Sequence, residues 1–145
     1  MAYASTTKVQ IADTREHIER LLRKHGAERF FYSDEPEKAT IGFVLKTLLI
    51  RITVPYAVVS SKTFAVGSEA REAQTKRSRW RALLFVLKAR FEAAEAGIST
   101  IEKEFLADTV MANKQTVNEW MRPQIVKMIA SGEMPQTLMI EGPRP

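Results

Sequence analysis

The sequence contains no cysteine. This absence excludes disulfides, thiolate metal sites and thiol nucleophiles, so stability has to come from packing. Long hydrophobic runs are also missing, because the longest unbroken one, residues 82–87, is far shorter than the roughly 20 residues that span a bilayer. Residues 1–10 lack the basic stretch followed by an apolar stretch that marks a signal peptide. We therefore expect a cytoplasmic protein that does not enter a membrane.

Motifs of catalysis and metal binding are absent as well. The chain has no P-loop, no dinucleotide-binding glycine pattern, no G-x-S-x-G elbow and no H-E-x-x-H pair. His17 and His25 are eight residues apart on one amphipathic helix without a pattern of carboxylates that would support metal ligands, which favours surface histidines over a metal pair. Asp34, Glu35 and Glu37 lie in a predicted turn, where acidic residues favour solvation. The sequence predicts a non-enzymatic protein without a metal site or a cofactor.

The length and composition fit one domain. A chain of 145 residues, of which 45% are hydrophobic, can bury a single core, and no internal repeat or linker divides it. We expect residues 1–145 to form one domain with an α+β core (1–97), a helical subdomain (98–133) and an extended tail (134–145) that contains three prolines.

Short-range patterns place a helix and several strands in the first part of the core. Apolar and polar side chains alternate over residues 7–11, which predicts a short strand. A capping box at residues 13–16 then starts a helix that ends at Gly26. We expect residues 46–47 to form the loop of a hairpin. Three runs rich in aromatic or β-branched residues predict the remaining strands, at 29–32, 39–45 and 48–54.

A long helix completes the core. Ser68 can cap a helix that runs to Ala96 before Gly97. Phe85 and Val86 fall outside its apolar stripe and predict a second packing surface, on the C-terminal helices or on another copy of the chain in a homo-oligomer. The expected fold class is α+β: a small antiparallel sheet in a β-α-β-β-β-α unit, packed on the long helix, with a helical C-terminal subdomain. The stripe that should pack on the sheet consists of Trp80, Leu83, Leu84, Leu87, Phe91 and Ala94.

Positive charge is concentrated in this helix. The whole chain has a net charge of +5, whereas residues 71–90 hold seven basic residues against Glu72 alone, so the rest of the chain sums to −1. Such a segment can be a solvated helix face, or it can bind an anionic partner such as nucleic acid. Three of its cations, Arg77, Arg81 and Lys88, lie within about 40° of one another on a helix. The predicted phosphate contacts are Arg71, Lys76, Arg77, Arg79, Arg81 and Lys88.

Two aromatic residues of the 29–32 strand, Phe31 and Tyr32, offer stacking platforms for nucleic acid bases. The alternative is burial, which is the usual location of phenylalanine.

A second nucleic-acid signal lies in residues 106–120, whose apolar spacing fits a helix-turn-helix. In that interpretation Gln115, Asn118 and Arg122 face DNA, and Trp120 is a core residue between the two helices. Any two capped amphipathic helices joined by a short loop also match in part. The turn position usually held by glycine is occupied by Met111.

Several segments of the chain resemble those of a known family. They are residues 79–88, 92–98, 104–107, 116–121 and 132–135, together with the helix ending at Gly26 and the strand at 41–43. They look like a family of uncharacterised phage and prophage proteins of similar length. Where members of that family tend to have a Pro-Asp-Gly turn, this chain has residues 112–114, and the family's turn argues against a standard helix-turn-helix. The resemblance implies the cytoplasm of a bacterial host and a role either in handling phage DNA or in blocking a host defence system.

These observations lead to one hypothesis and three alternatives. The first is a phage protein that binds nucleic acid independently of sequence, in DNA handling or recombination, and its order of elements is similar to the core of phage single-strand annealing proteins. The second is an inhibitor that binds a host protein, for example of the anti-CRISPR type. The third is a helix-turn-helix-like regulator, and the fourth is an oligomeric assembly factor that uses Phe85 and Val86.

Overall fold

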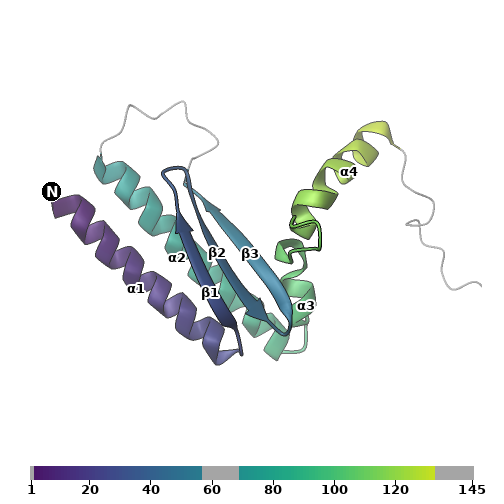
Figure 1. The fold of residues 1–145 in the computed structure, drawn as a ribbon, viewed down its shortest axis with the longest axis horizontal. Helices are drawn as coiled ribbons and strands as arrows, with labels where there is room; N and C mark the ends of the chain where they lie inside the picture. The colour runs from purple at the N-terminus through teal and green to yellow at the C-terminus, as the bar shows by residue number, and fades with distance from the viewer. Residues whose placement is uncertain (1, 57–68, 133–145) are drawn as a thin grey trace, which may run out of the picture.

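The structure is a computed structural model that describes residues 2–56 and 69–132. It has an α+β fold in which three strands form one sheet (Figure 1). The predicted fold class is therefore confirmed. The elements follow one another as α1 (Ala2–Lys24), β1 (Glu28–Asp34), β2 (Lys38–Leu45), β3 (Leu48–Pro55), α2 (Glu69–Glu95), α3 (Ile101–Glu104), the 3-10 turn η2 (Leu106–Asp108) and α4 (Val117–Ser131).

The sheet is antiparallel throughout, with β2 in the centre. Lys46 and Thr47 both have positive φ, of 49° and 67°, as the two-residue turn that best matches strand twist requires. This turn fixes the register of the hairpin, in which Leu45 pairs with Leu48. Alternate residues of β2 and β3 are buried, as the strand period of two demands. The hairpin predicted from the sequence is confirmed.

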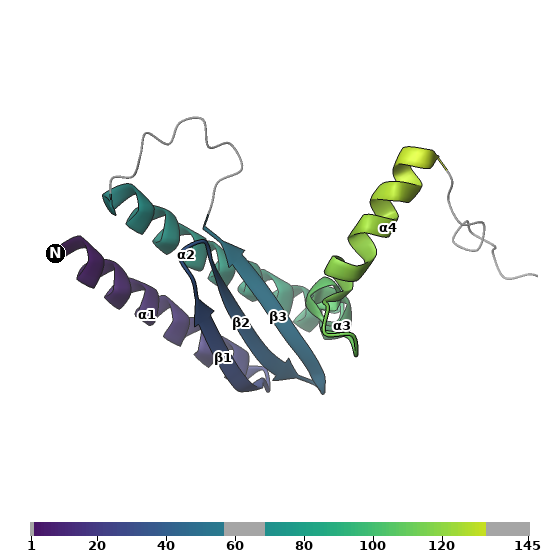
Figure 2. The same ribbon diagram turned by 45° about the horizontal axis from the view of Figure 1, so that its top comes forward.

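The two long helices, α1 and α2, lie side by side on one face of the sheet (Figures 1 and 2). The ring of His25, at the end of α1, stacks on Phe91 of α2 with 3.9 Å between the ring centroids. Gly26 ends α1 with φ +93°, and the N–H of Ala27 donates to the carbonyl of Leu22, which is the bonding of a left-handed helix terminus. The predicted stripe of α2 is buried at Trp80, Leu83, Leu84, Leu87 and Phe91.

The strand predicted at residues 7–11 is wrong, because these residues belong to α1. Ile11, Ile18 and Leu22 also follow a helical spacing, and in the structure all three pack into the core. Packing along α2 therefore decides in favour of the helix. The predicted capping box at residues 13–16 lies inside α1, where the hydroxyl of Thr14 donates to the carbonyl of Gln10.

The segment between η2 and α4 closes one edge of the sheet. Thr109 forms a bridge with Ile50, and the N–H of Val110 donates to the carbonyl of Leu49 over 2.8 Å. Val110 then bridges to Thr116 across a tight turn in which Lys114 has φ +68°. The prediction of a first helix in the helix-turn-helix is therefore wrong, because Thr109 and Val110 instead pair with the edge of β3.

The C-terminal helix, α4, projects away from the sheet (Figure 1). It begins with a capping box, in which Thr116 and Glu119 bond each other's backbone N–H groups, and it ends at Gly132 with φ +70°. None of its residues is buried. The expectation that Trp120 is a core residue is wrong, because its side chain is 45% exposed.

Candidate nucleic-acid interface

The position of α2 is fixed by a chain of hydrogen bonds that begins on its buried side. The indole N–H of Trp80 donates to the hydroxyl of Tyr56 over 3.0 Å, and this hydroxyl donates to the Asp34 carboxylate over 2.9 Å. Burial raises the pKa of Tyr56 to about 12, so its phenol stays protonated at neutral pH. The bonds link α2 to the ends of β3 and β1, and therefore fix which side of α2 faces outward.

Three predicted phosphate contacts, Arg77, Arg81 and Lys88, share that outward side of α2. Arg81 and Lys88 are exposed, and Arg77 is partly buried. In the part of the chain that the structure describes, none of the three forms an ion pair with a carboxylate. Their charges are thus not neutralised by acidic side chains of residues 2–56 or 69–132.

Arg77 is held in place by neutral groups. Its guanidinium donates to the amide oxygen of Gln10 on α1 over 2.8 Å and to the amide oxygen of Gln74, one turn earlier on α2. Amide oxygens orient a guanidinium without cancelling its charge. α1 therefore positions this cation at the seam between the two helices.

The remaining predicted contacts do not join this surface. The ammonium nitrogen of Lys76 lies 5.1 Å from the centroid of the Tyr56 ring, toward the sheet, and Arg79 lies on the same flank of α2. Arg71 is exposed near the start of the helix. Arg90 forms an ion pair with Asp108 over 2.8 Å, which neutralises part of the segment's charge. The six predicted residues thus surround α2 rather than lining one face.

An aromatic side chain that the sequence had suggested only for packing lies among the unpaired cations. Phe85 is 62% exposed, one turn after Arg81. The ammonium nitrogen of Lys88 lies 5.8 Å from its ring centroid. We name Arg77, Arg81, Phe85 and Lys88 the basic face of α2. The signal available in the sequence was the position of Phe85 outside the apolar stripe and next to the basic residues.

The predicted stacking residues, Phe31 and Tyr32, point to opposite faces of the sheet. Tyr32 faces the helices, where its hydroxyl donates to Glu19 over 3.4 Å and the guanidinium carbon of Arg15 lies 5.2 Å from its ring centroid. Burial raises the pKa of Tyr32 to about 12. Phe31 is exposed on the other face, away from α2. The structure therefore brings neither residue to the basic face of α2.

The three residues predicted to contact DNA in a helix-turn-helix are all exposed, but the two-helix frame is absent from the described residues. Gln115 lies in the tight turn before α4, where its N–H donates to the side chain of Asn113. Asn118 and Arg122 follow one turn apart on α4. They form a short polar strip on a projecting helix rather than a pair of helices suited to the major groove.

Neither similarity to known proteins nor a metal site points to a function for this chain. The chain matches no protein-family model, no curated protein and no solved structure. Among residues 2–56 and 69–132, no group of three or more His, Cys, Asp or Glu side chains is arranged to hold a metal ion. No helix in the same two ranges has the length and apolar character needed to cross a bilayer.

Proposed function

We propose that this protein binds nucleic acid independently of sequence through the basic face of α2. The observation that carries the proposal is the exposure of Phe85, 62%, between Arg81 and Lys88, neither of which is paired with a carboxylate in the described part of the chain. Cations that follow a phosphate backbone, combined with an exposed aromatic ring, are the two components of sequence-tolerant binding.

The chemistry of this face favours single strands. A phenylalanine on a convex helix can stack only on a base that is free of its neighbours, which a duplex does not offer. Base readout needs side chains that pair with base edges, and the two amides beside Arg77, those of Gln10 and Gln74, already accept hydrogen bonds from its guanidinium. The role we propose, in keeping with the resemblance to phage proteins, is the handling of phage DNA in a bacterial host.

A binding titration tests the proposal directly. Labelled single-stranded DNA, double-stranded DNA and RNA of matched length are titrated with the full chain at about 50 mM and about 200 mM salt. We expect the tightest binding for a single strand, no dependence on its sequence, and a steep loss of affinity with salt. Absence of binding to all three nucleic acids at the lower salt concentration contradicts the proposal.

One observation favours a second candidate, an inhibitor of a host protein. Phe85 and Val86 are adjacent and both exposed on α2, and adjacent large apolar side chains are typical of protein-binding hot spots. In that case one or two residues dominate the affinity and the salt dependence is shallow, so the same titration and its alanine variants separate the two functions.

A further inference from the structure

The C-terminal helix has too little packing to be stable alone. α4 has 15 residues, none of them buried, and isolated helices of this length are marginal in water. Ile125, Val126 and Ile129 are β-branched and disfavour a solvated helix, and Pro123 removes one backbone donor from its interior. α4 therefore requires a surface that the described residues of its own chain do not provide.

The side of α4 that needs cover is apolar and continuous. Five residues fall within about 120° around the helix axis at 100° per residue. Ile129 is the most exposed of them, at 72%. We name this set the apolar side of α4: Val117, Met121, Ile125, Met128 and Ile129.

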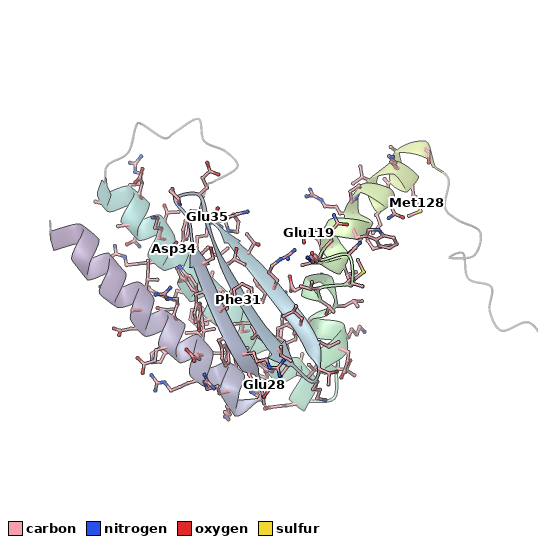
Figure 3. The ribbon with its side chains drawn as sticks, in the orientation of Figure 1. Glu28, Phe31, Asp34, Glu35, Glu119 and Met128 are labelled. Atoms are coloured by element: carbon pink, nitrogen blue, oxygen red, sulfur yellow. The ribbon has the colours of Figure 1, made fainter. Side chains whose placement is uncertain are left out.

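A second uncovered surface lies on the sheet, opposite α1 and α2. Phe31 of β1 is paired with Gly42 of β2, which is paired with Arg51 of β3, so the three form one row across this face. Phe31 and Leu49 are both exposed there. We name Phe31, Gly42, Val44 and Leu49 the outer sheet face (Figure 3 labels Phe31).

The chain cannot bring its own α4 over this face while the Arg51 contacts hold. The guanidinium of Arg51 donates to the carbonyl of Lys114 over 3.1 Å and forms an ion pair with Glu119 in the first turn of α4. These bonds hold the start of the helix beside β3 (Figure 3). From that point α4 leads away from the sheet in both ribbon views (Figures 1 and 2).

The charges around the two surfaces are complementary. Glu28 is the first residue of β1 and Glu35 directly follows its last residue, beside the outer sheet face, and both are exposed (Figure 3). Arg122 and Lys127 are exposed on α4. Within the described residues, no ion pair involves any of these four side chains. Around β1 the four exposed carboxylates of Glu28, Asp34, Glu35 and Glu37 outnumber the two exposed cations of Arg29 and Lys38, so a helix with cations meets a sheet rim of net negative charge.

We propose that the occupant of each surface is a second copy of this chain: the apolar side of α4 packs on the outer sheet face of the partner, and the partner's α4 packs reciprocally. One two-fold axis makes both contacts at once, which closes the assembly as a dimer and doubles the buried area. Neither surface includes the basic face of α2, so the dimer and nucleic-acid binding can be tested separately.

The test is the mass of the full chain in solution, measured by light scattering or sedimentation. We expect a dimer for the natural sequence, and monomers for Ile129→Asp and for Leu49→Lys, whose circular dichroism loses no more than the helical signal of the 15 residues of α4. Ile98→Asp is the control, because Ile98 is 80% exposed but belongs to neither surface, and it should remain a dimer. A natural protein that is monomeric up to about 100 µM, or a dimer that Leu49→Lys leaves intact, overturns the proposal.

Engineered cysteines provide a test that does not depend on weakened folding. The natural chain has no cysteine, so Ile129→Cys and Leu49→Cys variants each carry a single thiol. Mixing the two variants under mild oxidation should give a disulfide-linked heterodimer in high yield. If Ile129→Cys forms a disulfide-linked homodimer efficiently and the mixture gives no heterodimer, the helices pair with each other and the proposal is overturned.

Discussion

The ring of Phe31 lies directly over Gly42, its partner on the neighbouring strand. A Cβ at position 42 would come within 1.7 Å of the ring atom Cε1 of Phe31, so the ring has to move before any side chain fits. We expect Gly42→Ala to destabilise the protein by about 1–2 kcal/mol, because the displaced ring loses its contact with the sheet. Urea unfolding measures the change.

The control is the same substitution in a Phe31→Ala background. There the clash is gone, and replacing a strand glycine by alanine should be neutral or stabilising by about 0.5 kcal/mol through the unfolded state. Equal destabilisation in both backgrounds means that the contact between Phe31 and Gly42 is not the cause.

The Tyr56 hydroxyl should contribute to stability up to high pH. Tyr56→Phe leaves the buried indole N–H of Trp80 without its acceptor and should cost about 1–3 kcal/mol at pH 7. Burial raises the pKa of Tyr56 to about 12 from the usual 10, so the folded state holds this proton more tightly than the unfolded state. The contribution is complete below pH 10 and is lost as the pH rises to about 12.

Two measurements check this expectation. Denaturant unfolding of the natural protein and of Tyr56→Phe should give curves of stability against pH that converge between pH 10 and about 12. The ultraviolet absorbance of the folded protein should show Tyr32 and Tyr56 ionising near pH 12. Ionisation of both phenols at pH 10 in the folded state contradicts the prediction.

The Glu119 carboxylate should stabilise the start of α4 only where it is ionised. The backbone N–H of Thr116 lowers the pKa of Glu119 by donating to the carboxylate, and Arg51 lowers it further. The stabilisation is therefore present above the usual carboxyl pKa and is lost as the pH falls through the lowered value. Glu119→Gln should reduce the melting temperature at pH 7, and the difference should vanish in acid.

Glu37→Gln is the matched control for this experiment, because Glu37 is an exposed glutamate in a turn. Its melting temperature should follow that of the natural protein at every pH. A difference between Glu119→Gln and the natural protein that persists unchanged in acid shows that the ionised carboxylate does not act at this site.

The Trp120→Ala variant tests whether Trp120 is a surface residue or a core residue. The apolar pattern of the sequence predicts a core tryptophan, whose removal costs about 3–5 kcal/mol. The structure leaves the side chain 45% exposed on a helix without a buried residue. We therefore expect Trp120→Ala to lower the free energy of unfolding by less than about 1 kcal/mol in urea, because Trp120 belongs to neither surface of the proposed dimer. A loss of 3 kcal/mol or more means that α4 packs its tryptophan inside the protein.

The basic face of α2 predicts a uniform effect of charge removal. Arg77→Ala, Arg81→Ala and Lys88→Ala should each weaken binding to all nucleic-acid sequences alike and reduce the salt slope by about one counterion. Phe85→Ala should weaken binding to single strands by about 1–3 kcal/mol without changing the salt slope. Arg90→Ala is the control, since Asp108 already pairs with this cation. If Arg77→Ala, Arg81→Ala and Lys88→Ala change the affinity without changing its salt dependence, these three cations do not contact phosphates.

Several elements follow from the amino-acid pattern alone, because that pattern fits only one local structure. The alternation of 39–45 and 48–54 around Lys46 and Thr47 allows one hairpin register, and a shift by one residue would expose the buried side. The stripe from Trp80 to Phe91 repeats too regularly to be anything but one helix face. Gly26, Gly97 and Gly132 all have positive φ and follow helix ends, because glycine adopts this conformation without strain.

Where two patterns fit the same residues, long-range packing selects between them. Residues 7–11 match a strand and a helix equally, and contact with α2 selected the helix. Phe31 and Tyr32 must face opposite sides, but an irregularity between Glu28 and Phe31, where Arg29 has φ +58°, sets which ring is covered. Whether an apolar residue such as Trp120 is buried depends on what packs against its helix, which local spacing does not encode.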